Sequence, residues 1–340
     1  MAKKKLIFYQ SIAEISEIIE ILKKSPYGTY FIIVTGGKVL TNLLEKIKLK
    51  KDFGVKIYEF QALRLKNPIN ILKMYFRFNH SRDAKKILSF RYQDVIFFNY
   101  SYDFVAPIFL SKINSKKISF VNFYQRKFTN GKPKLKEIIQ KFIIKILHKN
   151  INVKMLYDKK YEQIFFFPRD KKIKEISKTN KMPKPIFDLP IPRNNKKKNI
   201  IYFDAFEERI YGTSFKHTLL KIFELADKAD LNIIIKKHPV SNLSECVNYS
   251  KKWSYILEPF PIELYKLRKV EYVFGLSSLS LSKISEKYPK IKVFSFLNLL
   301  KVDKNTLHMR KYLQKMMKSG IIYYPNNFNQ IKEIFTIKVK

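Results

Sequence analysis

The stretch Leu231–Ser278 organises the second half of the chain; it begins LNIIIKKHPVSN and ends EYVFGLSS. Its first apolar run, Asn232–Ile235, is rich in β-branched residues and predicts a buried strand. Pro239 cannot continue a sheet ladder, so the chain leaves the sheet before it and His238 falls at the carboxyl end of the strand. Open α/β sheets bind their ligands at this end.

The end of the same stretch repeats this arrangement. Glu271–Phe274 predicts a second strand, which stops at Gly275 and leads into a helix that starts near Ser277 and Ser278. Hydroxyls and free backbone N–H groups at a helix start form an anion site. Together with the imidazole of His238, they predict a phosphate site between two strand ends. The alternatives are a plain His-Pro turn and an ordinary serine N-cap.

The order of the motifs resembles the C-terminal half of the bacterial sialyltransferases of glycosyltransferase family 52. The shared order is strand–His-Pro, Pro-Phe-Pro-Ile-Glu-Leu at 259–264, strand–Gly-x-Ser-Ser, and Tyr-Pro-Lys-Ile-Lys-Val-Phe-Ser at 288–295. The resemblance implies that His238 assists a departing CMP phosphate, that the serine pair binds this phosphate, and that Glu263 holds the ribose hydroxyls. The predicted donor-binding residues are Lys236, His238, Pro239, Glu263, Gly275, Ser277 and Ser278.

The resemblance also implies a fold and a reaction. The fold is the GT-B arrangement, in which two doubly wound, Rossmann-like α/β domains face each other across a cleft. The reaction is an inverting, metal-independent transfer of sialic acid, or of a related nonulosonate, from a CMP-sugar to a cell-surface glycan such as lipooligosaccharide. The partners are the CMP-sugar donor and a glycolipid or oligosaccharide acceptor, and no cofactor is implied.

A base is needed to accept the proton of the acceptor hydroxyl. The sequence Asp-Ala-Phe-Glu-Glu at 204–208 directly follows the predicted strand Ile200–Phe203. The resemblance places the base in this loop. Glu207 is the first candidate, and Glu208 and Asp204 are the next candidates. The alternative is a helix N-terminus that carries acidic residues for its dipole.

The N-terminal half departs from the family pattern. Relatives carry an acidic-acidic-Gly triplet after one strand, whereas this chain reads FVNFYQ at 120–125, with Asn122 in place of the first acid. The amide of Asn122 cannot act as a base. Asp103 is a candidate to replace the missing acid, and the favoured alternative is that Asp103 caps the helix that follows it. This departure motivates a second hypothesis, a GT-B glycosyltransferase that uses another nucleotide-sugar donor such as a UDP-hexose.

Alternating apolar strands and amphipathic helices predict parallel sheets in two α/β domains. Residues 1–170 form the predicted acceptor-side domain and 200–340 the predicted CMP-binding domain. Residues 171–199 are dense in proline and charge and are the predicted linker. The predicted strands are 6–9, 30–34, 55–60, 95–98, 118–123, 200–203, 231–235, 255–257, 271–274 and 291–294.

The stretch Lys132–Lys149 carries the clearest helical period in the chain. We favour a helix that packs on the core with a solvated basic face, and the alternative is a helix that lies on anionic lipid. The basic stretch 305–319 raises the same two alternatives.

Charge dominates the composition: 68 Lys and Arg stand against 28 Asp and Glu, a net charge of +40 over 340 residues. Such a surface attracts polyanions, so a non-enzymatic polyanion binder is a third hypothesis, although no motif for specific nucleic-acid recognition occurs.

The single cysteine excludes a disulfide framework. No apolar run of ~18 residues occurs, so no spanning helix is expected. We expect a cytoplasmic protein, and peripheral binding to the inner face of the plasma membrane is left open. A homodimer is left open, and no metal site is predicted because the histidines lack ligand spacing.

Overall fold

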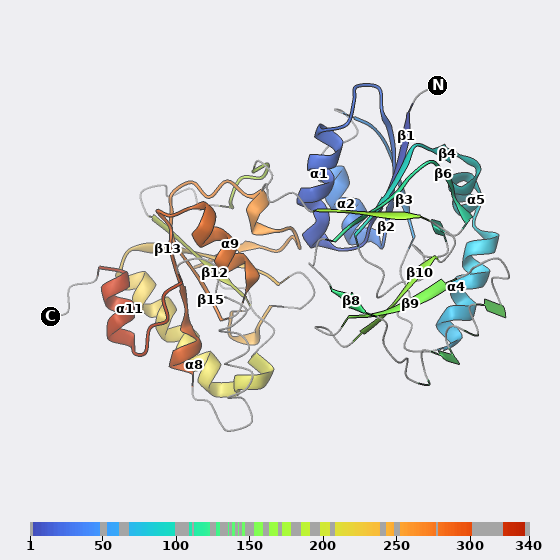
Figure 1. Ribbon diagram of the computed structural model, residues 1–340. Helices are drawn as coiled ribbons and strands as arrows, with labels where there is room; N and C mark the ends of the chain where they lie inside the picture. Colours follow the sequence, from blue (N-terminus) through green and yellow to red (C-terminus); the bar gives the residue numbers. More distant parts are fainter. Residues whose placement is uncertain are drawn as a thin grey trace. The chain divides into compact units, whose positions relative to one another are not determined.

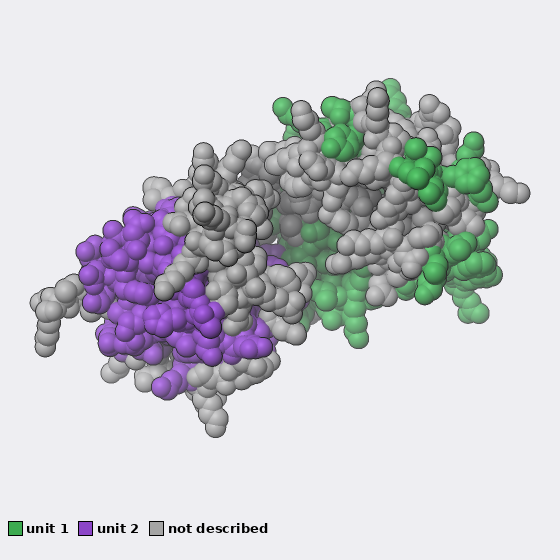
Figure 2. Space-filling model, turned by 90° about the horizontal axis from the view of Figure 1, so that it is seen from below, with its two compact units in different colours: residues 1–183 green, residues 184–340 purple. Residues whose placement is uncertain are grey.

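The computed structural model divides the chain into two compact units, residues 1–183 and 184–340, which Figure 2 shows in separate colours. The structure describes residues 3–47, 53–60, 68–98, 109–110, 112–122, 127–129, 135, 138–139, 142, 145–146, 153–158, 163–168, 172–177, 185–190, 198–204, 208–238, 243–247, 252–276, 278–300 and 322–336.

Unit 1 is built on a six-stranded sheet whose neighbouring strands are all parallel, in the order β11-β7-β5-β1-β2-β3 (Figure 1). When the six strands are renumbered in chain order and read from the β3 edge, this is the order 3-2-1-4-5-6 of Rossmann folds. The six strands are β1 (Lys4–Tyr9), β2 (Tyr30–Thr35), β3 (Gly54–Glu59), β5 (Asp94–Phe97), β7 (Ile118–Val121) and β11 (Ile173–Ile176). The four inner strands are mostly apolar because both faces of a parallel sheet are covered, whereas the edge strands β3 and β11 carry more polar residues.

The helices of unit 1 follow from local sequence. In α1, Ile15, Ile18, Ile19 and Leu22 recur with helical spacing and are buried. Residues 68–89 contain two helices, because the Ser81 hydroxyl accepts a hydrogen bond from Ala84 N at 3.1 Å and caps the second one. The helices are η1 (Ile12–Glu14), α1 (Ile15–Lys23), α2 (Lys38–Lys46), α4 (Pro68–His80) and α5 (Arg82–Ser89).

Unit 1 also contains two small sheets that the sequence did not predict. The strands β8 (Phe128–Thr129), β9 (Val153–Asp158) and β10 (Gln163–Pro168) form an antiparallel sheet. The short strands β4 (Arg91–Tyr92) and β6 (Asn114–Ser115) pair in parallel.

Unit 2 contains a five-stranded parallel sheet in the order β14-β13-β12-β15-β16, which is the doubly wound order 3-2-1-4-5. Its strands are β12 (Lys198–Phe203), β13 (Leu231–Lys236), β14 (Ser254–Ile256), β15 (Val270–Gly275) and β16 (Lys292–Ser295). Its helices are α8 (Glu208–Lys228), η2 (Glu245–Val247), η3 (Ile262–Leu264), α9 (Leu279–Lys287), η4 (Phe296–Leu299) and α11 (Phe328–Ile334).

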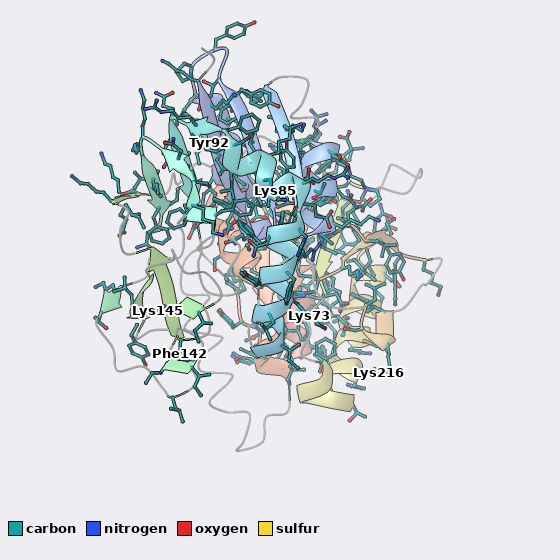
Figure 3. All side chains as sticks on the ribbon, turned by 90° about the vertical axis from the view of Figure 1, so that its right-hand side faces the viewer. Lys73, Lys85, Tyr92, Phe142, Lys145 and Lys216 are labelled. Atoms are coloured by element: carbon teal, nitrogen blue, oxygen red, sulfur yellow. The ribbon has the colours of Figure 1, made fainter. Side chains whose placement is uncertain are left out.

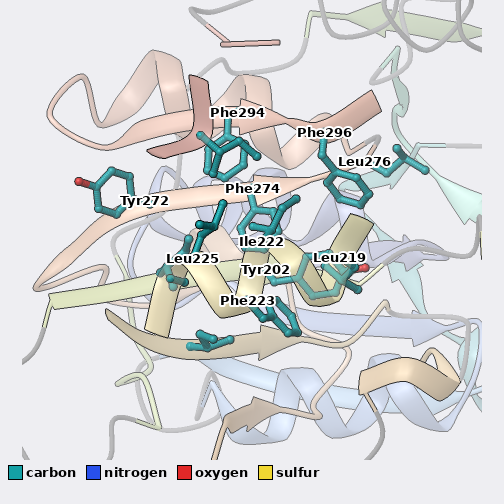
Figure 4. Close-up of a cluster of buried hydrophobic side chains, with 14 of the residues drawn as sticks. Tyr202, Leu219, Ile222, Phe223, Leu225, Tyr272, Phe274, Leu276, Phe294 and Phe296 are labelled. Atoms are coloured by element: carbon teal, nitrogen blue, oxygen red, sulfur yellow. The ribbon is translucent and has the colours of Figure 1, made fainter. Parts of the chain in front are cut away.

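The core of unit 2 is aromatic (Figure 4). Phe274 on β15 stacks on Phe294 of β16 with ring centroids 5.0 Å apart, and it lies 5.0 Å from Tyr202 of β12 on the other side. Phe223 of α8 covers Tyr202 edge-on at 5.6 Å. Aromatic contacts of this kind pack the adjacent strands β12, β15 and β16 against one another and against α8.

The predicted fold class, two doubly wound α/β units, is confirmed by the two strand orders. That the units face each other across a cleft stays a prediction. The predicted linker 171–199 contains part of each unit: β11 pairs with β7 of unit 1, Phe187 forms a bridge with Tyr265 of unit 2, and β12 starts at Lys198. Sequence composition missed β11 because an edge strand of four residues, IKEI, is half polar.

The favoured interpretation of 132–149, a helix packed on the core, is wrong for the positions that the structure describes. They are helical, and their apolar side chains are exposed: Leu135, Ile138, Ile139, Phe142 and Ile146. Periodicity reveals an apolar stripe but not what covers it. The predicted basic helix at 305–319 lies outside the described residues. No helix in the described part of the chain is long and apolar enough to cross a bilayer.

Candidate functional site

A cavity lies within unit 2 at the carboxyl ends of its central strands. It is a half-open hollow whose roughly 340 Å³ of unfilled space includes open solvent. The lining residues are Phe203, Asp204, Lys236, Lys237, His238, Phe260, Pro261, Ile262, Ser278 and Ser280.

The strand order explains why the cavity forms here. From β12 the chain moves outward to β13 and β14 on one side, and then returns to place β15 and β16 on the other side. The order therefore reverses between β12 and β15, and the loops that leave these strands diverge. Such a switch point is where doubly wound sheets bind ligands. The sequence prediction that a site lies at the ends of two strands of one sheet agrees with this placement of His238 and Ser278.

Lys236 is the last residue of β13 and is only 5% exposed. Its Nζ donates hydrogen bonds to the carbonyl oxygens of Lys237 and Glu258, both at 2.9 Å. Burial is the main cause that lowers the pKa of Lys236 to about 8, against the opposing effect of Glu258 and Glu263. The ammonium ties two loops together at the cavity wall, and among the described residues it has one N–H left for a ligand.

His238 lies two residues beyond β13 and is half-buried. Burial lowers the pKa of the His238 imidazole, and the charge of Lys236 lowers it further. The ring is therefore neutral at pH 7 in the absence of a ligand. An anion in the cavity favours the protonated ring, so His238 can take up a proton as negative charge arrives.

Asp204 follows β12 and is 3% exposed. Its carboxylate accepts hydrogen bonds from the Ser244 hydroxyl at 2.6 Å, from Ser244 N at 2.9 Å and from the Tyr202 hydroxyl at 3.3 Å. These contacts anchor a distant loop to the end of β12. A carboxylate engaged in this way is a structural anchor and a poor choice for the base.

Ser278 is the N-cap of α9, and its Oγ accepts a hydrogen bond from Ser280 N at 3.2 Å. Ser278 and Ser280 both line the cavity, so the start of α9 lies at its wall, and anion binding by this helix start stays a prediction. At Gly275 a Cβ would lie 3.2 Å from Phe203 Cβ and 3.3 Å from Phe203 O, and the part of this residue in donor binding stays a prediction. The position is glycine because β12 and β15 approach closely.

Glu263 lies in η3 and is 4% exposed. Its Oε1 pairs with Nζ of Lys283 on α9 at 3.0 Å, whereas Oε2 is buried with no hydrogen-bond partner among the described residues. The cavity is lined by its neighbours Pro261 and Ile262 but not by Glu263 itself. Glu263 is therefore not a wall residue of the cavity, and its predicted role with the ribose stays a prediction.

Several predicted residues are not placed. Glu207, Pro239, Ser277 and Asp103 lie outside the described residues. Glu208 is the first residue of α8. The choice of the base among these carboxylates therefore stays a prediction.

Sequence reasoning missed several contributors to the site, of which three are informative. Phe260 and Ser280 line the cavity, and Ser244 anchors Asp204 from 40 positions further along the chain. The motif PFPIEL at 259–264 was a usable signal for Phe260, but nothing local identified Ser244. In unit 1, Asn122 donates a hydrogen bond to Glu175 of β11 at 2.8 Å, so a carboxylate does lie where the acidic triplet was sought.

No group of His, Cys, Asp or Glu side chains within the described ranges could hold a metal ion. The metal-independent reaction stays a prediction.

No protein-family model matches the chain, and no curated protein matches it in sequence. Solved structures of similar overall architecture exist at low identity. The UDP-GlcNAc 2-epimerase of Methanocaldococcus jannaschii is 14% identical, with 99% of this chain and 93% of that chain covered and a TM-score of 0.47. The UDP-GlcNAc 2-epimerase of Neisseria meningitidis is 13% identical, with 98% of each chain covered and a TM-score of 0.42. A spinosyn forosaminyltransferase is 10% identical, covers 98% and 91%, and has a TM-score of 0.45. These likenesses assign no activity, and the fold class rests on the strand orders above.

Proposed function

We propose that the cavity in unit 2 binds the phosphate of a nucleotide-sugar and that the chain is a glycosyltransferase of the GT-B type. One observation carries the proposal: Lys236, His238 and Ser278 converge on one cavity at the switch point of a doubly wound sheet. A buried ammonium, a neutral imidazole with a lowered pKa and a capped helix start are a set that recognises phosphate.

The proposed reaction is a substitution at the anomeric carbon. An acceptor hydroxyl forms the new C–O bond, the bond to the nucleotide phosphate breaks, and the electron pair stays on the phosphate oxygen. Lys236, the Ser278 hydroxyl and the N-terminus of α9 stabilise this charge. The hydroxyl proton passes to a carboxylate, for which Glu207 and then Glu208 are the proposed bases.

Two donors are proposed. The order of the motifs favours CMP-sialic acid or a related nonulosonate, with a glycolipid or oligosaccharide such as lipooligosaccharide as the acceptor. For either donor, the proposed contact of Glu263 with the nucleotide ribose rests on the order of the motifs alone. A UDP-hexose is the second candidate, since Asn122 replaces the first acid of the family triplet and its amide is engaged with Glu175.

Titration calorimetry with CMP, UDP and inorganic phosphate tests the site. His238→Ala and Ser278→Ala are expected to weaken nucleotide binding by roughly tenfold or more, the magnitude of one charge-assisted hydrogen bond. The matched controls are His217→Ala on the exposed side of α8 and Ser285→Ala, whose hydroxyl donates to Ser282 O within α9. Equal effects of the site and control variants would refute the site.

Release of free nucleotide in the presence of a glycan acceptor distinguishes the donors. CMP-sialic acid and UDP-N-acetylglucosamine, the latter being the ligand present in two of the similar structures, are assayed side by side. Turnover of only one identifies the donor. Tight, steeply salt-dependent DNA binding with no turnover of either would instead support the polyanion-binding hypothesis.

A further inference from the structure

The segment 132–149 exposes an apolar stripe. Leu135, Ile138, Ile139, Phe142 and Ile146 are helical and 48–73% exposed. At 100° per residue they fall within an arc of about 100° on one side of the helix. Phe142 and Lys145 lie near one another in Figure 3, and Lys145 is exposed at the border of the stripe. We name these five apolar residues the 135–146 stripe.

The helix α4 of the same unit repeats the feature. Ile69, Leu72 and Phe76 are exposed by 54%, 41% and 56% and are spaced three and four residues apart. The C-terminal end of α4 packs on the core, because Phe78 is buried there and contacts Phe109 edge-on, with ring centroids 4.8 Å apart. The exposed face is therefore not a sign of an undocked helix.

Both stripes belong to segments in which basic residues outnumber acidic ones. The segment 132–149 contains six lysines and one glutamate. In α4, PINILKMYFRFNH, no acid occurs, and Lys73 and Arg77 are exposed beside the apolar positions (Lys73 is labelled in Figure 3). Long basic side chains can lay their methylenes along an apolar surface while their charges reach outward.

An exposed apolar stripe bordered by cations fits one partner best. A second copy of this chain would bring the same positive charge against itself, and a folded acidic protein would have to cover two separate helices. An anionic bilayer accepts apolar side chains at the depth of its headgroups and attracts the lysines around them. We propose that unit 1 docks on an anionic membrane surface through the 135–146 stripe, with the exposed face of α4 as a second contact.

Vesicle flotation with phosphatidylcholine alone and with added phosphatidylglycerol tests the proposal on the full chain. Wild type is expected to float only with the anionic vesicles and to be released by salt. The variant F142S/K145E removes one ring and reverses one charge. A lysine near an anionic surface contributes about 1 kcal/mol, or roughly fivefold, so reversal plus loss of the ring lowers binding by more than tenfold.

The matched control is L220S/K216E on α8 of unit 2. It makes the same charge change and removes an apolar side chain that is 38% exposed, outside both stripes. Retained flotation of this control beside loss in F142S/K145E supports the proposal. Equal loss in both, or no loss in either, overturns it. A dimer in solution that F142S/K145E dissociates overturns it in favour of self-association. Binding of F142S/K145E to free CMP is expected to be unchanged, which separates this proposal from the proposed function.

Discussion

The buried ammonium of Lys236 makes the stability of unit 2 depend on pH in a way that can be calculated. The folded protein lowers the pKa of this group from 10.5 to about 8, chiefly through burial. The unfolded chain keeps the ordinary pKa of a lysine. Between these two values the unfolded state binds more protons than the folded one, so this lysine makes the free energy of unfolding rise as pH increases.

The size of the effect follows from the two pKa values. At pH 7 the lowered pKa of Lys236 reduces the free energy of unfolding by about 3 kcal/mol. About 2.5 kcal/mol of this reduction disappears between pH 7 and 10, as the lysine of the unfolded chain loses its proton. Other lysines and tyrosines titrate in the same window, so the absolute stability is not diagnostic. The informative quantity is the difference in unfolding free energy between wild type and Lys236→Met. Methionine keeps the length of the side chain without its charge, and its loss of two hydrogen bonds shifts stability equally at all pH values.

The assay uses the single tryptophan of the chain. Trp253 lies in unit 2 and packs on Phe223 of the core, with centroids 4.8 Å apart, so its fluorescence follows the unfolding of this unit in urea. Wild type is expected to gain about 2.5 kcal/mol relative to Lys236→Met from pH 7 to 10. Lys216→Met corrects for the loss of one charge from a strongly basic chain. A difference that stays flat over this pH range would refute the buried, tethered ammonium.

Two further predictions concern how unit 2 is held together. Gly275→Ala is expected to lower the free energy of unfolding by about 1–3 kcal/mol, because the new methyl would press on Phe203 at 3.2 Å, whereas Gly36→Ala meets nothing closer than 3.6 Å and should be tolerated. Calorimetric melting checks both, and equal effects would contradict the close approach of the strands. Ser244→Ala is expected to lower the free energy of unfolding by about 1–2 kcal/mol, because it removes the 2.6 Å hydrogen bond to Asp204. Urea unfolding followed by Trp253 fluorescence measures this change, and an unchanged stability would contradict the anchoring role of Ser244.

Local sequence was sufficient for most strands of the two parallel sheets and for part of the site. Continuous apolar runs identified the parallel strands, and the serine before α9 gave the start of this helix at Leu279. Because proline and glycine end strands, His238 and Ser278 could be assigned to strand ends before any coordinates existed. Their meeting in one cavity follows from the parallel pairing of β12 with β13 and β15.

Long-range contacts set the rest. The anchoring of Asp204 by Ser244, the pairing of Glu263 with Lys283 and the addition of β11 to the unit 1 sheet join residues far apart in the chain. The exposure of Phe142 likewise depends on what the rest of the chain leaves uncovered. Strand and helix formation respond to neighbours within a few residues, and a sequence pattern records those preferences. Which buried group finds which partner is fixed only when distant segments pack, since burial and hydrogen bonding belong to the assembled unit.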